Sequence, residues 1–328
     1  MSIPGPESIL PGSRTDAQKF IMDGVWSLAK KKRVLRLRAK ILQELRNFFI
    51  AGGYLEIETP CLIPAPAPEF HIDTMICQDW FLHPSPELCM KRLLAAGYDK
   101  IFQICRCFRQ HERGARHLPE FTMLEWYRRD ADYRDLMEEC EDLILHLAAA
   151  LGYGAALSYQ GQVIRLQKPW ERITVQGAFE KYAALSVEEA LSGDCFDEVL
   201  TARVEPDLGR EQPTFLCDYP LALGSLARAK KEDASLVERF ELYIAGMEIA
   251  NAFTELTDAK EQRRRFVKEE DNRRRAGKPP YPVPELFLAS LGSLEESAGI
   301  ALGLDRLVMI FADALHIDDV VAFPPETL

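Results

Sequence analysis

Hydrophobic residues recur at helical spacing across residues 19–51, and this pattern predicts a long helix near the N-terminus. The apolar positions include Ile41, Leu45 and Phe49, which would lie on one helix face. The Gly52-Gly53 pair would end the helix. Apolar and polar residues then alternate over 54–60, which predicts a strand ending at Pro60.

The same reading covers the rest of the chain. It predicts helices over 87–96, 136–151 and 258–276, and a mostly helical stretch over 152–209. It predicts strands over 101–108, 120–128, 172–175, 214–219, 239–245 and 248–256, and a strand passing into a helix over 298–311. No repeat or linker divides the chain. We therefore expect an α+β fold, an antiparallel sheet flanked by helices, over residues 15–328, preceded by a flexible tail over 1–14.

Composition narrows the class of protein. The 328 residues are 47% hydrophobic, and no apolar run is long enough to span a membrane. The N-terminus has no apolar signal core, so we expect a cytoplasmic protein. A formal net charge of −11 argues weakly against a large nucleic-acid footprint. The basic stretch 30–40 is either a solvated helix face or a patch for an acidic partner.

Eight cysteines are scattered along the chain, without a CxxC pair or the spacing of a zinc site. Cys105 and Cys107 would share one face of a strand. Reduced, buried thiols are the favoured interpretation.

A first group of polar residues lies on a loop between two predicted strands, beginning at Arg109 and ending at His117. Arginine suits planar contacts with phosphate, and an aromatic ring such as Phe121 can stack on a purine. This group is either a phosphate site or an ordinary polar hairpin tip.

A second group comprises Glu248, Asn251 and Glu255. Residues seven apart on a regular strand face opposite ways, so these carboxylates could share a site only across a bulge, which we expect near 250–252. They would then suit a partly hydrated Mg²⁺. The alternative is a mixed surface strand.

A third group surrounds Arg306, which follows a buried strand among apolar neighbours. A buried arginine needs an anionic partner. That partner is either a ligand phosphate or carboxylate, or an internal acid such as Asp305.

Together these segments resemble the class II aminoacyl-tRNA synthetases, in their lysyl/aspartyl subclass. The run FRQHERGARHLPEFTMLEWY resembles motif 2, GIALGLDRLVM resembles motif 3, and AGGYLEIETPCL resembles motif 1. The run ERFELYIAGMEIANAFTELTD is similar to a segment of the lysyl-tRNA synthetases. The likeness extends from about Val34 to the C-terminus. It implies the class II catalytic core and, through motif 1, a homodimer.

Only about thirty residues precede Val34, too few for the anticodon-binding OB-fold of a lysyl-tRNA synthetase. The chain therefore resembles the stand-alone elongation factor P–(R)-β-lysine ligases. Ala301 supports this resemblance, because the ligases have Ala at this position of motif 3 and the lysyl-tRNA synthetases have Gly. The resemblance implies ATP and Mg²⁺, (R)-β-lysine as substrate, elongation factor P as acceptor, and no tRNA.

The resemblance also assigns roles to residues. The catalytic residues would be Arg109 and Arg306. The ATP site would comprise Arg109, His111, Glu112, His117, Phe121, Glu248, Ile249, Gly303 and Arg306. The amino-acid site would comprise Ser85, Pro86, Glu87, Tyr127, Asn251, Glu255 and Ala301, with Glu248 and Glu255 as metal ligands. The chain departs from the family pattern at two positions, with His111 in place of a glutamate and Leu118 in place of an asparagine.

Two other functions remain open. A truncated synthetase could still charge tRNA, with the missing domain supplied by another chain. A catalytically inactive synthetase fold could serve as a binding or regulatory module, although such a protein would be expected to lose Arg109 and Arg306.

Overall fold

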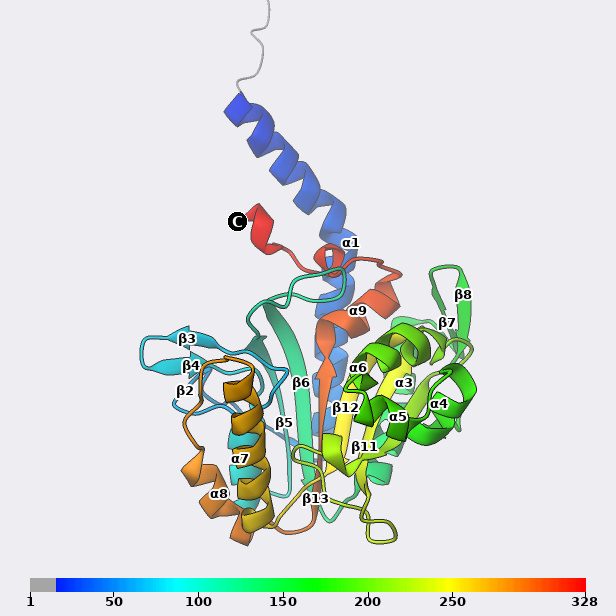
Figure 1. The fold of residues 1–328 in the computed structure, drawn as a ribbon. Helices are drawn as coiled ribbons and strands as arrows, with labels where there is room; N and C mark the ends of the chain where they lie inside the picture. Colours follow the sequence, from blue (N-terminus) through cyan, green and yellow to red (C-terminus); the bar gives the residue numbers. More distant parts are fainter. Residues whose placement is uncertain (1–15) are drawn as a thin grey trace, which may run out of the picture.

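An eight-stranded sheet forms the centre of the molecule (Figure 1), with strand order β1-β5-β6-β13-β12-β11-β10-β9. The computed structural model describes residues 16–328, with side chains from residue 28 onward. The predicted tail, residues 1–14, lies outside this range. The pairs β1–β5 and β9–β10 are parallel and the other neighbours antiparallel. The predicted α+β class is confirmed.

The strands of the main sheet are β1 (Leu55–Glu56), β5 (Lys100–Phe108), β6 (Glu120–Arg129), β9 (Glu171–Thr174), β10 (Thr214–Pro220), β11 (Leu236–Ile244), β12 (Met247–Thr254) and β13 (Ser297–Gly303). Two smaller sheets consist of β2 (Leu62–Ile63), β3 (Met75–Cys77) and β4 (Trp80–Leu82), and of β7 (Ala156–Tyr159) and β8 (Gln162–Arg165). The helices are α1 (Asp16–Ala51), α2 (Glu87–Ala95), α3 (Tyr133–Leu151), α4 (Val175–Tyr182), α5 (Val187–Ser192), α6 (Phe196–Val199), α7 (Ala259–Arg275), α8 (Glu285–Ser290) and α9 (Leu304–Ala312).

Helices α1, α3 and α9 cover one face of the sheet and form the largest core with it. On α1, Ile41, Leu45 and Phe49 follow one another at intervals of four residues, and all three are fully buried, as the apolar pattern predicted. Phe49 packs against Trp126 of β6. Burying large side chains of this kind contributes about 1.5–3 kcal/mol each.

The opposite face of the sheet carries a cavity. Helices α7 and α8 lie to one side of this face and α4, α5 and α6 to the other (Figure 1). The space between them is a cavity of about 570 Å³, floored by residues of β6, β12 and β13. Of these helices, α6 and α7 contribute residues to the cavity wall, and the first turn of α9 reaches the cavity from the other face.

Two predictions of local structure were wrong in extent. Over 54–60 only Leu55–Glu56 form a strand. The stretch 152–209 begins with the hairpin β7–β8, whose turn residues Gln160 and Gly161 both have positive φ. Such a two-residue turn matches the twist of paired strands. The chain therefore forms a hairpin at this position, where the apolar spacing had predicted a helix.

The basic stretch of α1 is partly bonded within the chain. Lys31 Nζ donates to the carbonyls of Asp318 and Val321, and Arg38 Nη1 lies 2.5 Å from Asp305. At least these two cations already have partners. None of the helices in the described part of the chain combines the length and apolar character of a membrane span.

Candidate active site

The antiparallel register aligns one residue from each of five strands in a single row, and all of them except Gln103 line the cavity. The row runs through Gln103, Glu125, Ala301, Asn251 and Glu241, each directly opposite the next. A second row, two residues along each strand and on the same face, runs through Tyr127, Gly299, Phe253 and Arg239. Residues separated by more than a hundred positions in the sequence therefore meet on one surface.

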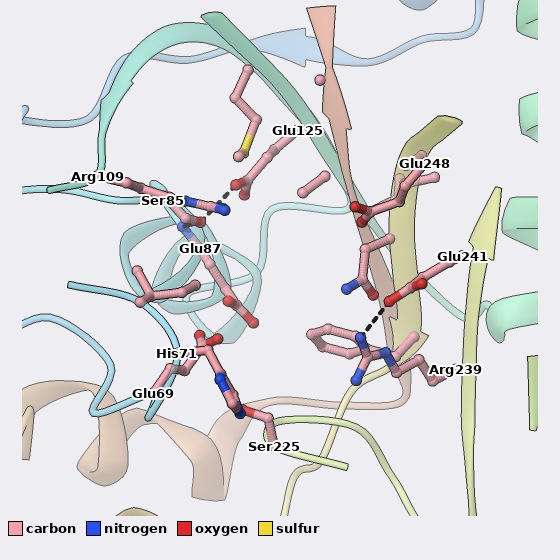
Figure 2. A pocket seen from close by; sticks show the side chains of 18 of the residues that line it. Glu69, His71, Ser85, Glu87, Arg109, Glu125, Ser225, Arg239, Glu241 and Glu248 are labelled. Atoms are coloured by element: carbon pink, nitrogen blue, oxygen red, sulfur yellow. Dashed lines mark hydrogen bonds and ion pairs between the residues drawn. The ribbon is translucent and has the colours of Figure 1, made fainter. Parts of the chain in front are cut away.

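Arg109 follows β5 directly and points into the cavity (Figure 2). Its backbone N–H donates to Pro119 across the hairpin at 3.0 Å. Its guanidinium lies 5.2 Å from the Phe121 ring centroid and 3.6 Å from Glu112. Arg109 and Phe121 therefore lie side by side in the cavity, as expected of a site that binds a phosphate and a purine.

Arg306 lies in the first turn of α9 and faces the same cavity. Its Nη1 donates to the Glu248 carbonyl at 2.9 Å and to the Glu248 carboxylate at 3.0 Å. Its Nη2 lies 2.5 Å from His117 Nε2. Burial and the Arg306 charge lower the pKa of His117, so a neutral ring accepts this bond.

Asp305 is not the partner of Arg306. Its carboxylate accepts hydrogen bonds from Arg38 and from the backbone N–H of Thr122. Arg38 and Asp305 therefore tie α1 to motif 3, and Arg306 is left to face the cavity.

The predicted turn Ser85-Pro86-Glu87 lies at the other side of the cavity, at the start of α2. Ser85 Oγ donates to Glu125 at 2.6 Å, and the Glu87 N–H donates to Ser85 Oγ at 3.0 Å (Figure 2). Lys91, one turn further along α2, lies 2.5 Å from both Glu87 and Glu255.

Carboxylates outnumber cations around this turn. Glu125 and Glu255 are buried, and Lys91 is the cation paired with Glu87 and Glu255. Burial, with the charge of Glu87 adding to it, raises the pKa of Glu125 well above its usual range. The same causes raise the pKa of Glu255 to about 8, although Lys91 opposes the shift. Such a pocket favours a cationic ligand.

Gly299 was not predicted as a site residue. A Cβ there would lie 2.1 Å from Tyr127 Cε1 and 2.5 Å from Glu255 Oε1. Tyr127 in turn donates to Glu125 at 2.8 Å. The glycine thus leaves room for the phenol and the carboxylate to lie together, a relationship that only the strand register reveals.

The remaining predicted residues divide into two groups. Those that line the cavity are Asn251, Ala301, Ile249 and Gly303. His111 is exposed and lies outside the cavity lining. Leu118 is buried against the core and also lines the cavity, so this departure from the family pattern lies at the site itself.

The two carboxylates assigned to one metal are far apart. The bulge exists, with Ile249 as the extra residue, one position before the expected range. However, Glu248 pairs with Arg306 and Glu255 with Lys91, and roughly 20 Å of strand lies between them. One ion cannot bind both side chains, so this assignment is corrected.

Other carboxylates lie closer to Glu248. Tyr243 donates to Glu241 at 2.7 Å and to Glu205 at 3.2 Å. Burial and the charges of Glu248 and Glu241 raise the pKa of Glu205 to about 7. Oxygen ligands that repel one another in this way fit Mg²⁺. Glu241 was not predicted as a metal ligand. The one feature of the sequence that could have pointed to it is its place in the run ERFELYIAGMEIANAFTELTD, which is similar to a segment of the lysyl-tRNA synthetases.

A family model described as class II tRNA synthetases (D, K and N) matches residues 17–327. The chain belongs to this family. Membership accounts for motif 2 at Arg109, motif 3 at Arg306 and the mostly antiparallel sheet between them.

Curated relatives narrow the resemblance within the family. The chain is 40% identical over 304 residues to proteins named elongation factor P–(R)-β-lysine ligase. They include those of Salmonella paratyphi B (strain ATCC BAA-1250 / SPB7), Salmonella schwarzengrund (strain CVM19633) and Salmonella choleraesuis (strain SC-B67). Each alignment covers 87% of this chain and 93% of the relative. The predicted kinship with these ligases is confirmed.

Proposed function

We propose that this chain uses ATP to activate (R)-β-lysine as its adenylate and transfers it to a lysine side chain of elongation factor P. The 40% identity to ligases of that name supports the reaction. The acidic pocket around Ser85 is the observation that supports an amino acid with two amines as the substrate. Glu125 has no ion-pair partner among the described residues, and Glu255 shares Lys91 with Glu87, so an amino acid with two amines would supply the positive charge that this pocket is short of.

The substrate would lie between the Ser85 turn and the rows of the sheet. Tyr127, Glu125 and Glu255 would receive its amines, with Asn251 close by, whose buried Oδ1 has no hydrogen-bond partner among the described residues. Ala301 lies between Glu125 and Asn251, so its methyl group would limit the space available to the carbon chain of the bound amino acid. In this orientation the carboxylate of the substrate would point toward Arg109.

Activation needs no general base, because a carboxylate is already nucleophilic at neutral pH. Its oxygen attacks the α-phosphorus of ATP, a new O–P bond forms, and the bond to the pyrophosphate breaks. Arg109 would hold the α-phosphate, and Arg306 the γ-phosphate, against the developing charge. His117 and Phe121 would flank the adenine.

Mg²⁺, when bound, would offset phosphate charge, and Glu241 and Glu248 are the carboxylates suited to hold it. In the transfer step, the neutral amine of the acceptor lysine attacks the carbonyl of the mixed anhydride. An amide bond forms, AMP leaves with the bonding electrons, and the attacking nitrogen releases one proton to solvent.

We also propose a homodimer, with cytoplasmic location and no role for tRNA. A formal net charge of −11 favours a protein acceptor over RNA, whose phosphate backbone is attracted to basic surfaces. Ile50 and Leu55, at the motif 1 segment, expose 60% and 51% of their surface and would be covered by a second copy. Sedimentation at equilibrium tests this assembly.

The test of function is acceptor transfer. Purified protein, ATP and Mg²⁺ are mixed with labelled (R)-β-lysine or α-lysine, and with elongation factor P or bulk tRNA. We expect label on the protein, with β-lysine preferred. Label on tRNA with α-lysine would instead identify a minimal synthetase. No ATP–pyrophosphate exchange with either amino acid would indicate a binding module.

A further inference from the structure

A histidine and two cysteines lie close together next to the Ser85 turn, and none of them has a role in the site described above. His83, just beyond β4, faces Cys105 and Cys107 of β5, and one donor atom from each lies within 4.8 Å of the others. Three segments of the chain meet here, because the His83 N–H donates to Cys61 and its carbonyl accepts from Phe108. The donor atoms are therefore held by backbone pairing.

The tautomer of His83 is fixed by its surroundings. Its Nε2 lies 2.7 Å from the Arg106 carbonyl, which can only accept, so Nε2 carries the proton. The lone pair is then on Nδ1, which is buried and has no hydrogen-bond partner among the described side chains. His83 as a whole is 1% exposed. A backbone carbonyl that fixes one ring nitrogen while the other faces thiols is the arrangement found at histidine metal ligands.

The thiol geometry fits a tetrahedral ion. Cys105 Sγ lies 3.9 Å from Cys107 Sγ. Zinc bound at about 2.3 Å from each sulfur, at the tetrahedral angle, separates the two sulfurs by about 3.8 Å. A disulfide between them is disfavoured, because alternate residues of one strand lie near the upper limit of the Cα separation that a disulfide spans.

We propose that His83, Cys105 and Cys107 bind a thiophilic cation, Zn²⁺. Two thiolates and one neutral imidazole are the donor set that such an ion prefers over hard cations. Cys61 is exposed and lies opposite His83 in the continued β2–β4 ladder, where it or a water completes the coordination. The bound ion links the segment leading into Ser85 to the strand leading into Arg109.

This site does not depend on the proposed reaction, so its test measures binding. Reduced protein is titrated with Zn²⁺ against a chromophoric chelator, and with Co²⁺ as a spectroscopic substitute. We expect one ion per chain, thiolate-to-cobalt charge-transfer absorption, and a melting temperature that rises with zinc. Cys107→Ser and His83→Gln should each weaken zinc binding at least about tenfold.

Cys77→Ser is the matched control, because Cys77 is an exposed thiol of β3 outside the cluster. It should bind zinc as the wild type does. Circular dichroism checks that each variant folds, and Cys107→Ser, the smaller change, carries the test if His83→Gln does not fold. Equal zinc affinity in wild type, Cys107→Ser and Cys77→Ser, or no charge-transfer band, would overturn the proposal.

Discussion

Gly299 lies directly opposite Tyr127 in the ladder between β13 and β6, and the phenol ring occupies the place that a side chain at 299 would need. Tyr127 is 3% exposed and donates to Glu125. The absence of one methyl group thus sets where a pocket tyrosine and two pocket carboxylates lie.

Gly299→Ala should therefore impair amino-acid binding. The new Cβ would push Tyr127 and Glu255 aside, and overpacking of this kind costs about 1–3 kcal/mol. We expect the KM for the amino acid to rise about tenfold or more in pyrophosphate exchange. Gly292→Ala is the control, since a Cβ there meets nothing within 4 Å. An unchanged KM in Gly299→Ala would refute this assignment of the pocket.

Ala301→Gly should shift selectivity between lysine isomers. Ala301 lines the cavity between Glu125 and Asn251, and removal of its methyl group opens the floor for a differently placed backbone amine. One methyl group discriminates by about 1–3 kcal/mol, so kcat/KM for α-lysine relative to β-lysine should rise roughly tenfold or more. Ala298→Gly, on the buried opposite face of β13, should leave the ratio unchanged. Equal ratios in both variants would count against this role.

Arg109→Ala and Arg306→Ala should each abolish adenylate formation without unfolding the protein. Removing one preorganised donor to a developing charge lowers kcat by about 10²–10³. ATP–pyrophosphate exchange measures the loss, and circular dichroism checks the fold. Arg113→Ala is a suitable control, because Arg113 pairs at the surface with Glu326 and Asp318. Near-normal exchange in either site variant would show that the phosphate assignment is wrong.

Glu205 should make stability depend on pH. Its folded pKa is about 7, above the ordinary value of 4.5. Its favourable contribution is therefore complete below about pH 4.5 and is lost as the pH rises through about 7. Glu205→Gln should then melt progressively higher than wild type as the pH increases from about 5 to 8.

Melting curves across this range provide the measurement for Glu205. Glu198→Gln, at an exposed position of α6, should track the wild type at every pH. A gap between Glu205→Gln and wild type that stayed constant with pH would exclude the raised pKa.

The sequence alone determined the elements that depend on local pattern and on motif. The apolar spacing at Ile41, Leu45 and Phe49 identified both the helix and its buried face, because 3.6-residue periodicity is a local property. The runs around Arg109 and Arg306 identified the family, since their residue order is itself the signature.

The tertiary structure alone decided which distant residues meet. Strand register pairs Ala301 with Glu125 and Glu241 with Asn251, and places Gly299 against Tyr127. It also separates Glu248 from Glu255, which the sequence had grouped. Register is set by long-range pairing and packing, and a shift of one residue would move every side chain to the other face. No spacing within a single segment could therefore predict these contacts.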